Sequence, residues 1–241
     1  KNVPMKTTDH LKVSLKGYKK NDFAMIMGYP GSTERYISSW EVIDKLSSNK
    51  NTILIRTNKL NIIREAMDSD PVAKIKYVAK YNRSSNYWKY YIGENNAIQK
   101  LDVVAAKQQK ENKFTSWIQS DSTLRNEYGK ALTYIKNYFD TIQPYQKPYD
   151  FILEGFFRGC EIVDFAYDVN AFITVLDQET DSIEIRNAAD RLRGSANEFF
   201  SNYIQQIDKD MTKQMIKLYI ENVEPRFYPT FITTILKKQK G

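Results

Sequence analysis

The spacing of hydrophobic positions along the chain changes at about residue 34. Before this point, residues 10–15 alternate polar and apolar side chains and residues 23–27 form a short apolar run, with Gly17 and a charged cluster between them. Such a pattern is typical of two strands joined by a turn. Two strands of this length are marginal on their own. We therefore expect them to belong to a sheet whose other strands lie outside this chain.

From about residue 34 onward, apolar residues recur every three or four positions, which predicts amphipathic helices. The expected helices, in chain order, are two on either side of residues 49–51, one from Asp70-Pro71 to about Gly93, one over 97–119, one from Asp121 or Ser122 that is broken by Pro144 and Pro148, one over 149–176, one over 183–207, and a last one capped by Asp208 and ended by Glu224-Pro225. Helices with one apolar stripe bury it against each other. The sequence therefore predicts a mainly α fold, a bundle of about seven to nine helices over residues 34–241 with a short β-hairpin-like appendage over residues 1–33.

Composition agrees with a helical bundle. The chain has only 9 glycines and 7 prolines in 241 residues, and a scarcity of these turn-forming residues argues against a strand-and-hairpin architecture. The longest apolar stretches, such as residues 151–157, are too short to span a bilayer, so we expect a water-soluble chain. The chain starts at Lys1 without an initiator methionine, and we expect it to be processed or excised.

The basic net charge of +7 raises nucleic acid or an anionic membrane as a partner. Lysine and arginine are, however, spread through every segment and interleaved with 29 carboxylates, which favours a solvated basic surface. We expect neither nucleic acid nor membrane as a partner. The alternative is a free-standing basic helical module for nucleic acid or a protein partner, which the basic tail at Lys237–Lys240 would suit.

Catalytic and metal-binding patterns are sparse. The single histidine, His10, lies on an expected strand, and no G-x-S-x-G nucleophile motif accompanies it. The single cysteine, Cys160, lies in an apolar stretch, which favours a buried structural thiol. We therefore expect no catalytic residue, metal or other cofactor in this chain.

Four carboxylates share one face of the helix expected over residues 149–176; they are Glu154, Glu161, Asp164 and Asp168. A di-iron bundle needs Glu-x-x-His pairs on separate helices, and one histidine cannot supply them. With Arg158 nearby, these carboxylates are better explained as a solvated, salt-bridged face.

Residues 81–93 are unusual because asparagine and serine, which are modest helix formers, are clustered with tryptophan and tyrosines. If this segment is helical, Asn82, Asn86 and Lys89 share one face. Two readings are open at this point: aromatic residues packed as core at a frayed helix end, or a binding site.

Two segments resemble a known family. Residues 23–36, FAMIMGYPGSTERY, followed by Ser39-Trp40-Glu41-Val42, resemble the GYPG-x-T-x-RY stretch of the Gram-negative serine dipeptidyl-peptidases of the type-seven and type-eleven group. Residues 85–89, SNYWK, with Ile92-Gly93, are similar to that family's NYWK…IG segment. The order and spacing of these segments also match. The resemblance covers essentially the whole chain and is specific over the first hundred residues.

The resemblance implies a trypsin-like double β-barrel with a helical domain inserted between the catalytic Asp and the nucleophilic Ser. It implies that the appendage belongs to this incomplete barrel and that the catalytic triad lies outside the chain. The helical domain would then act as a cap over the cleft of an exopeptidase that removes dipeptides from free N-termini. Its partners would be peptide N-termini and the catalytic barrel of the same polypeptide. A periplasmic or cell-surface location is implied too, and a homodimer stays open.

The resemblance also implies two substrate-binding residues. Asn86 matches the family's asparagine that anchors the substrate α-ammonium, and an amide oxygen can accept one of the three ammonium N–H donors. An anchor at a fixed distance from the nucleophile would count off two residues of the substrate. Trp88 would wall the site or simply pack against the protein.

Overall fold

The computed structural model describes residues 4, 6–29, 31–178 and 181–238, and the chain divides into two compact units, Lys1–Tyr36 and Ile37–Gly241. In the first unit, the described residues are exposed and contain no strand. The strands expected over residues 10–15 and 23–27 are therefore not formed in this structure. An extended segment needs neighbouring strands to pair its backbone groups, and two short strands alone are marginal. That this unit belongs to a barrel stays a prediction.

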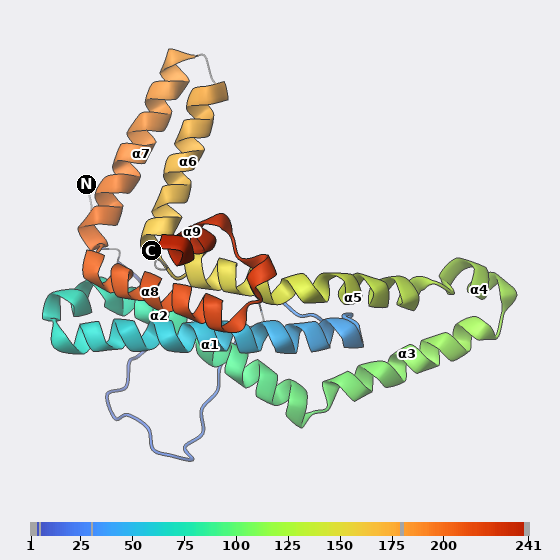
Figure 1. Ribbon diagram of the computed structural model, residues 1–241. Helices are drawn as coiled ribbons and strands as arrows, with labels where there is room; N and C mark the ends of the chain where they lie inside the picture. Colours follow the sequence, from blue (N-terminus) through green and yellow to red (C-terminus); the bar gives the residue numbers. More distant parts are fainter. Residues whose placement is uncertain (1–3, 5, 30, 179–180, 239–241) are drawn as a thin grey trace. The chain divides into compact units, whose positions relative to one another are not determined.

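The second unit is a helical bundle, as predicted (Figure 1). Its described residues form nine α-helices, one π-helical segment (η1) and one 3-10 turn (η2). Their bounds are α1 Ser39–Ser69, α2 Pro71–Lys100, α3 Val103–Gln119, α4 Ser122–Tyr128, α5 Ala131–Asp150, η1 Phe151–Phe157, α6 Glu161–Gln178, α7 Ser182–Asn202, α8 Gln205–Asn222, η2 Pro225–Phe227 and α9 Thr230–Lys238. No helix among the described residues combines the length and the apolar character needed to cross a bilayer.

Helix α1 is continuous, so the expectation of two helices separated at residues 49–51 is wrong. The polar residues that suggested a break are held by other helices. Asn49 is buried and donates to Asn95 of α2 at 2.9 Å, and Asn51 donates to Asp150 of α5 at 2.9 Å. Because these amides find partners inside the bundle, the helix does not need to end where they occur.

Helix α2 begins as predicted. The Asp70 carboxylate accepts from the Val72 N–H at 2.8 Å, and proline occupies the first helical position. The helix continues past Gly93 to Lys100, beyond its expected end. The helix expected over 97–119 is broken at Asp102, which takes a left-handed conformation with a φ of 46°, and α3 starts only after it.

Helices α4 and α5 replace one expected helix. Helix α4 begins at Ser122, within the predicted start, and the Asp121 carboxylate caps it by accepting from the Thr123 N–H at 2.6 Å. Pro144 and Pro148 do not break the pattern but lie inside α5, which continues directly into η1. Contacts at the end of α5 hold it in place: Ser48 and Asn51 of α1 both donate to Asp150 at 2.9 Å.

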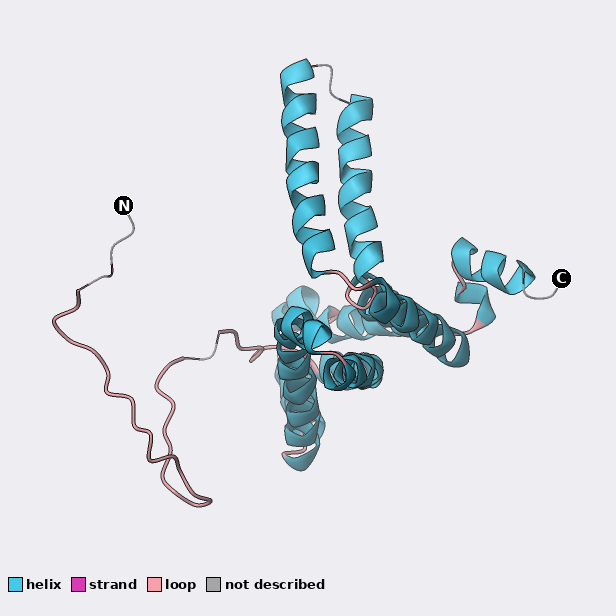
Figure 2. Ribbon diagram, turned by 90° about the vertical axis from the view of Figure 1, so that its left-hand side faces the viewer, coloured by secondary structure: helices cyan, strands magenta, loops and turns pink. Residues whose placement is uncertain are grey.

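The helix expected over residues 149–176 is also interrupted, because η1 ends before α6 begins at Glu161. Helices α6 and α7 form a hairpin that projects from the rest of the unit in both views (Figures 1 and 2). The ring of Phe165 stacks on that of Phe199 at 4.6 Å between centroids within this hairpin. The core lies instead where α1, α2, η1, α8 and α9 meet, and includes Ile55, Tyr77, Phe151, Met215 and Tyr219.

Candidate functional site

A groove of about 1010 Å³ lies within the helical unit. Helix α2 supplies one side of the groove. The turn between η1 and α6, together with the C-terminal end of α7, supplies another, and side chains from α1 and α8 complete the lining. Charged side chains, tyrosines and apolar side chains all contribute, which is the mixed lining expected of a binding site.

One wall of the groove is held by an ion-pair network around the buried Glu154 carboxylate. Arg56 of α1 donates through Nε to Glu154 Oε2 at 2.9 Å, and its Nη2 lies 2.8 Å from the same oxygen. Arg158 donates to Glu154 Oε1 at 2.5 Å. The Arg56 guanidinium also lies over the rings of Tyr87 and Tyr91, at 5.5 and 5.9 Å from their centroids. The network fixes η1 against α1 and α2.

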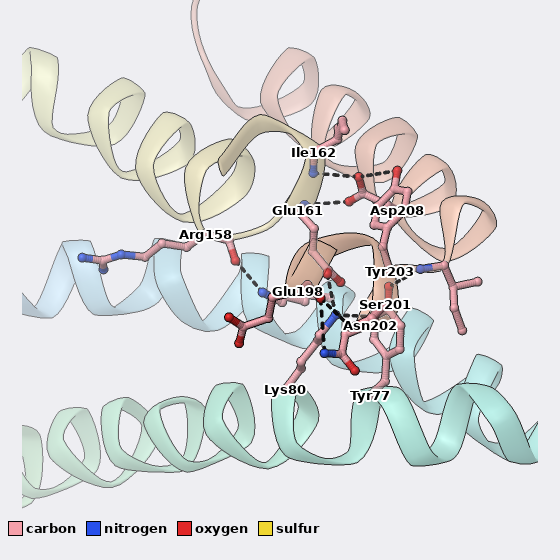
Figure 3. Close-up of polar contacts among 12 residues, drawn as sticks. Tyr77, Lys80, Arg158, Glu161, Ile162, Glu198, Ser201, Asn202, Tyr203 and Asp208 are labelled. Atoms are coloured by element: carbon pink, nitrogen blue, oxygen red, sulfur yellow. Dashed lines mark hydrogen bonds and ion pairs between the residues drawn. The ribbon is translucent and has the colours of Figure 1, made fainter. Parts of the chain in front are cut away.

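A second polar cluster joins α2, α6, α7 and α8 (Figure 3). Lys80 of α2 donates to Glu161 Oε2 at 2.5 Å and to the Asn202 carbonyl oxygen at 2.9 Å. The buried Asp208 accepts from the Glu161 N–H at 2.7 Å and the Ile162 N–H at 3.0 Å. Asp208 was expected to cap a last helix. It lies instead in the first turn of α8 and caps α6.

Tyrosines complete this second cluster. Tyr203 donates to Asp208 at 3.2 Å (Figure 3), and burial together with the Asp208 charge raises the pKa of Tyr203 to about 12. The Ile204 N–H donates to the Tyr77 hydroxyl at 3.3 Å, and burial raises the pKa of Tyr77 above its ordinary value. Both hydroxyls therefore stay neutral at physiological pH and serve as hydrogen-bonding groups.

The predicted substrate-binding residues lie on α2 and differ in exposure. Asn86 is exposed, as are Asn82 and Lys89 on the same face. Trp88 is half-buried, and its Nε1–H donates to Thr57 Oγ1 of α1 at 2.9 Å. This hydrogen bond is a packing contact that attaches α2 to α1, and a role of Trp88 as a wall of the substrate site stays a prediction.

The four carboxylates expected on one helix face are divided by the turn at residues 158–160. Glu154 is buried with Arg56, Glu161 pairs with Lys80, and Asp168 accepts from Ser195 at 3.2 Å. In the part of the chain that the structure describes, no group of three or more His, Cys, Asp or Glu side chains is placed to hold a metal ion.

The two remaining chemical candidates are separated as well. His10 is exposed in the first unit. Cys160 is buried in the helical unit, and burial raises its pKa to about 11. A thiol with so high a pKa is a poor nucleophile at neutral pH, which agrees with the predicted structural role.

Sequence reasoning missed Arg56, Lys59 and Asp208 as residues of the groove. The signal was a charged residue inside an apolar repeat. Arg56 follows Ile53, Leu54 and Ile55, and Asp208 follows Ile207. A charged side chain at such a position must find a partner within the fold, and here each one does so.

Comparison with known proteins gives a consistent result. A family model described as peptidase S46 matches residues 1–241. Dipeptidyl-peptidase 7 of Porphyromonas endodontalis is 35% identical over 243 residues, covering 100% of this chain and 28% of the relative. An Asp/Glu-specific dipeptidyl-peptidase of Flavobacterium psychrophilum is 30% identical, covering 99% of this chain and 33% of the relative. The chain thus spans about a third of the length of these curated relatives.

A solved structure supports the fold. The crystal structure of Porphyromonas endodontalis DPP11 superposes with a TM-score of 0.62 at 23% sequence identity, covering 81% of this chain and 28% of that one. At this identity the likeness concerns the fold alone, and it indicates that the helical arrangement also occurs inside a larger protein.

Proposed function

The chain belongs to the peptidase S46 family, and from this premise we propose that it is the non-catalytic helical cap of a serine exopeptidase that releases dipeptides from free N-termini. The cap covers the active-site cleft, which the remainder of a longer polypeptide supplies. The observation that carries the proposal is a match over the whole chain to relatives named dipeptidyl-peptidases, of which it spans only 28–33%.

The distribution of chemical groups supports a non-catalytic role. A Ser-His-Asp triad needs an imidazole held against the serine and oriented by the carboxylate. The sequence offers His10 alone, which is exposed in the first unit, and the helical unit has no histidine. Cys160 cannot substitute as a nucleophile because burial keeps it protonated. The family resemblance assigns the bond-breaking groups of the proposed enzyme to the barrel of the same polypeptide.

The position of Asn86 supports a role in substrate binding. Its side chain is exposed on α2, so its amide oxygen is accessible to a substrate ammonium. Its neighbours Arg83 and Tyr87 line the groove. An anchor on a helix that Trp88 attaches to α1 is rigid, and a rigid anchor can set a fixed distance to the nucleophile. In the proposed enzyme this distance gives dipeptide specificity.

The same proposal includes the compartment. The resemblance to the Gram-negative dipeptidyl-peptidases implies that the enzyme acts in the periplasm or at the cell surface. Cell fractionation followed by activity measurement tests this part. Activity confined to the cytoplasmic fraction would contradict it.

The proposed function is tested with dipeptidyl reporter substrates, one with a free amino terminus and one acetylated. Each is incubated with the 241-residue chain and with the longer polypeptide that contains it. We expect no turnover by the chain alone, and turnover of only the free-amino substrate by the longer polypeptide. Hydrolysis by the isolated chain would contradict the non-catalytic role. Equal hydrolysis of the acetylated substrate by the longer polypeptide would contradict recognition of the ammonium.

A further inference from the structure

One buried hydroxyl in the groove has no hydrogen-bond partner. Ser84 of α2 lines the groove and is only 5% exposed. Among the described residues, its Oγ is the one buried side-chain nitrogen or oxygen without a hydrogen bond. Leaving a buried hydroxyl unpaired costs about 1–3 kcal/mol. Such a group at the wall of a groove indicates that a ligand atom is its partner.

A lysine lines the same groove without a carboxylate partner. The Lys59 ammonium donates to the Arg158 carbonyl oxygen, and within the described residues it forms no ion pair. Burial, followed by the neighbouring Arg56 guanidinium, lowers the pKa of Lys59, and the more weakly acting charges of Glu161 and Glu154 offset this only in part. A desolvated ammonium beside another cation is stabilised by an anion.

The helix register places these two residues at nearly the same level along the groove. Helices α1 and α2 run antiparallel, and the hydrogen bond between Trp88 and Thr57 shows which positions lie opposite each other. In this register the position opposite Lys59 is residue 86, so Ser84 lies only two residues, or about 3 Å along the helix axis, from the level of Lys59. The Ser84 carbonyl oxygen also accepts from Arg56, one turn before Lys59, at 3.4 Å. Both side chains line one groove at nearly the same level.

The other charges of the groove restrict where an anion can bind. Arg56 is neutralised by Glu154, and Lys80 by Glu161. Asp164 of α6 and Glu198 of α7 also line the groove, and they would repel an anion from their side. The positive potential is therefore concentrated on the side formed by α1 and α2. There the exposed Arg83 lines the groove one residue before Ser84 and adds a further cation.

We propose that the groove binds a carboxylate group, held by the Lys59 ammonium and the Ser84 hydroxyl. The groove, at about 1010 Å³, is much larger than a lone ion needs, and the rings of Tyr87 and Tyr91 contribute to its lining. An acidic side chain of a peptide is therefore the favoured source of the carboxylate, and a free dicarboxylate is the other. This site goes beyond the proposed ammonium anchor, because it recognises the opposite charge.

The test is calorimetric titration of the 241-residue chain with three ligands at low and high salt. They are the blocked peptide acetyl-Ala-Glu-Ala-amide, the matching peptide with glutamine, and free glutarate. We expect the glutamate peptide to bind, the glutamine peptide to bind at least about tenfold more weakly, and salt to weaken the difference. Both peptides lack a free ammonium, so the result does not depend on Asn86.

Two variants with matched controls locate the site. Lys59→Met and Ser84→Ala should each weaken binding of the glutamate peptide about tenfold or more. Lys50→Met, exposed on α1, and Ser85→Ala, buried on α2 outside the groove lining, should leave it unchanged. Because the Ser84 hydroxyl is unpaired, Ser84→Ala should not lower the melting temperature of the ligand-free chain. Circular dichroism checks that each variant folds.

The outcomes separate the proposal from its rivals. Glutarate binding as tightly as the peptide would support the carboxylate site and assign it to a small acid. Equal affinity for the glutamate and glutamine peptides would overturn the proposal, because the groove would then not distinguish a carboxylate from a neutral amide. Absence of binding by all three ligands at millimolar concentration would overturn it too, as would full retention of affinity in both Lys59→Met and Ser84→Ala. None of these results changes the expected reporter assay, so the two proposals fail independently.

Discussion

Asp208, in the first turn of α8, accepts a hydrogen bond from the backbone N–H of Glu161 at 2.7 Å. Its second oxygen accepts from the N–H of Ile162 at 3.0 Å. These are orphan donors of the first turn of α6, and a carboxylate there also interacts favourably with the helix dipole. The residue that caps α6 comes from a different helix, 47 positions away in sequence. Asp208 therefore ties the projecting α6–α7 hairpin to the core of the bundle.

Replacing Asp208 with asparagine should destabilise the chain by about 1.5–3 kcal/mol. The amide has a single accepting oxygen, so one N–H of α6 loses its partner, and the charge that favours the helix start is removed. Urea unfolding followed by circular dichroism measures the change. Asp210→Asn, on the same helix but with a partly exposed side chain, is the matched control and should cost less than about 0.5 kcal/mol. Equal losses of unfolding free energy in the two variants would show that the capping of α6 by Asp208 does not stabilise the chain more than a partly exposed carboxylate does.

The buried carboxylate of Glu154 serves two arginines of unequal exposure. Glu154→Gln should cost about 3–5 kcal/mol, because it leaves the Arg56 guanidinium, whose side chain is only 11% exposed, without its counter-charge. Arg158→Gln should cost less than about 1 kcal/mol, since the Arg158 side chain is 56% exposed. Thermal or urea unfolding of both variants gives the comparison. A larger loss for Arg158→Gln than for Glu154→Gln would contradict this account of the network.

The helical class of the fold could be predicted because apolar residues recur with helical spacing over most of the chain. Local capping signals were also readable: Asp70 and Asp121 each cap the helix that follows them directly. Both depend only on residues next to each other in sequence. Capping signals of this kind are local, so they do not depend on how the rest of the chain folds.

Two of the misread positions share one physical cause, which is a partner from a distant helix. Asn49 looked like a loop residue, but Asn95 satisfies it inside the bundle. Asp208 looked like a local cap, but it caps α6. Sequence spacing cannot show these long-range partners. For the same reason the groove residue Lys59 was missed, and Ser84 was not singled out within the unusual segment 81–93.

Stability should fall at alkaline pH because of Cys160. Burial raises its pKa from an ordinary 9.0 to about 11. The folded chain therefore binds the thiol proton more tightly than the unfolded chain, and this contribution is complete below pH 9 and lost as the pH rises to about 11. Its full size is about 2–3 kcal/mol. Urea unfolding from pH 8 to 11 measures the decline. In Cys160→Ala the slope over this range should be shallower, and an identical slope would exclude the thiol as its source.

Trp88 should contribute to stability rather than to turnover. Trp88→Phe keeps an aromatic ring but removes the indole N–H that donates to Thr57, which should cost about 1 kcal/mol in unfolding free energy. In the longer polypeptide, kcat/KM for a dipeptidyl reporter should change less than about threefold. Normal stability combined with a large fall in kcat/KM would instead make Trp88 a wall of the substrate site.

Asn86 should show the reverse pattern. Because its side chain is exposed on α2, Asn86→Ala should leave the unfolding free energy within about 0.5 kcal/mol of the parent chain. In the longer polypeptide, the variant should lose a charge-assisted hydrogen bond worth about 1.5–3 kcal/mol, so kcat/KM for a free-amino reporter should fall roughly 10- to 150-fold. Asn96→Ala, also exposed on α2, is the matched control and should leave kcat/KM unchanged. If kcat/KM is the same in both variants, Asn86 does not hold the substrate ammonium. Another part of the enzyme must then set the dipeptide specificity.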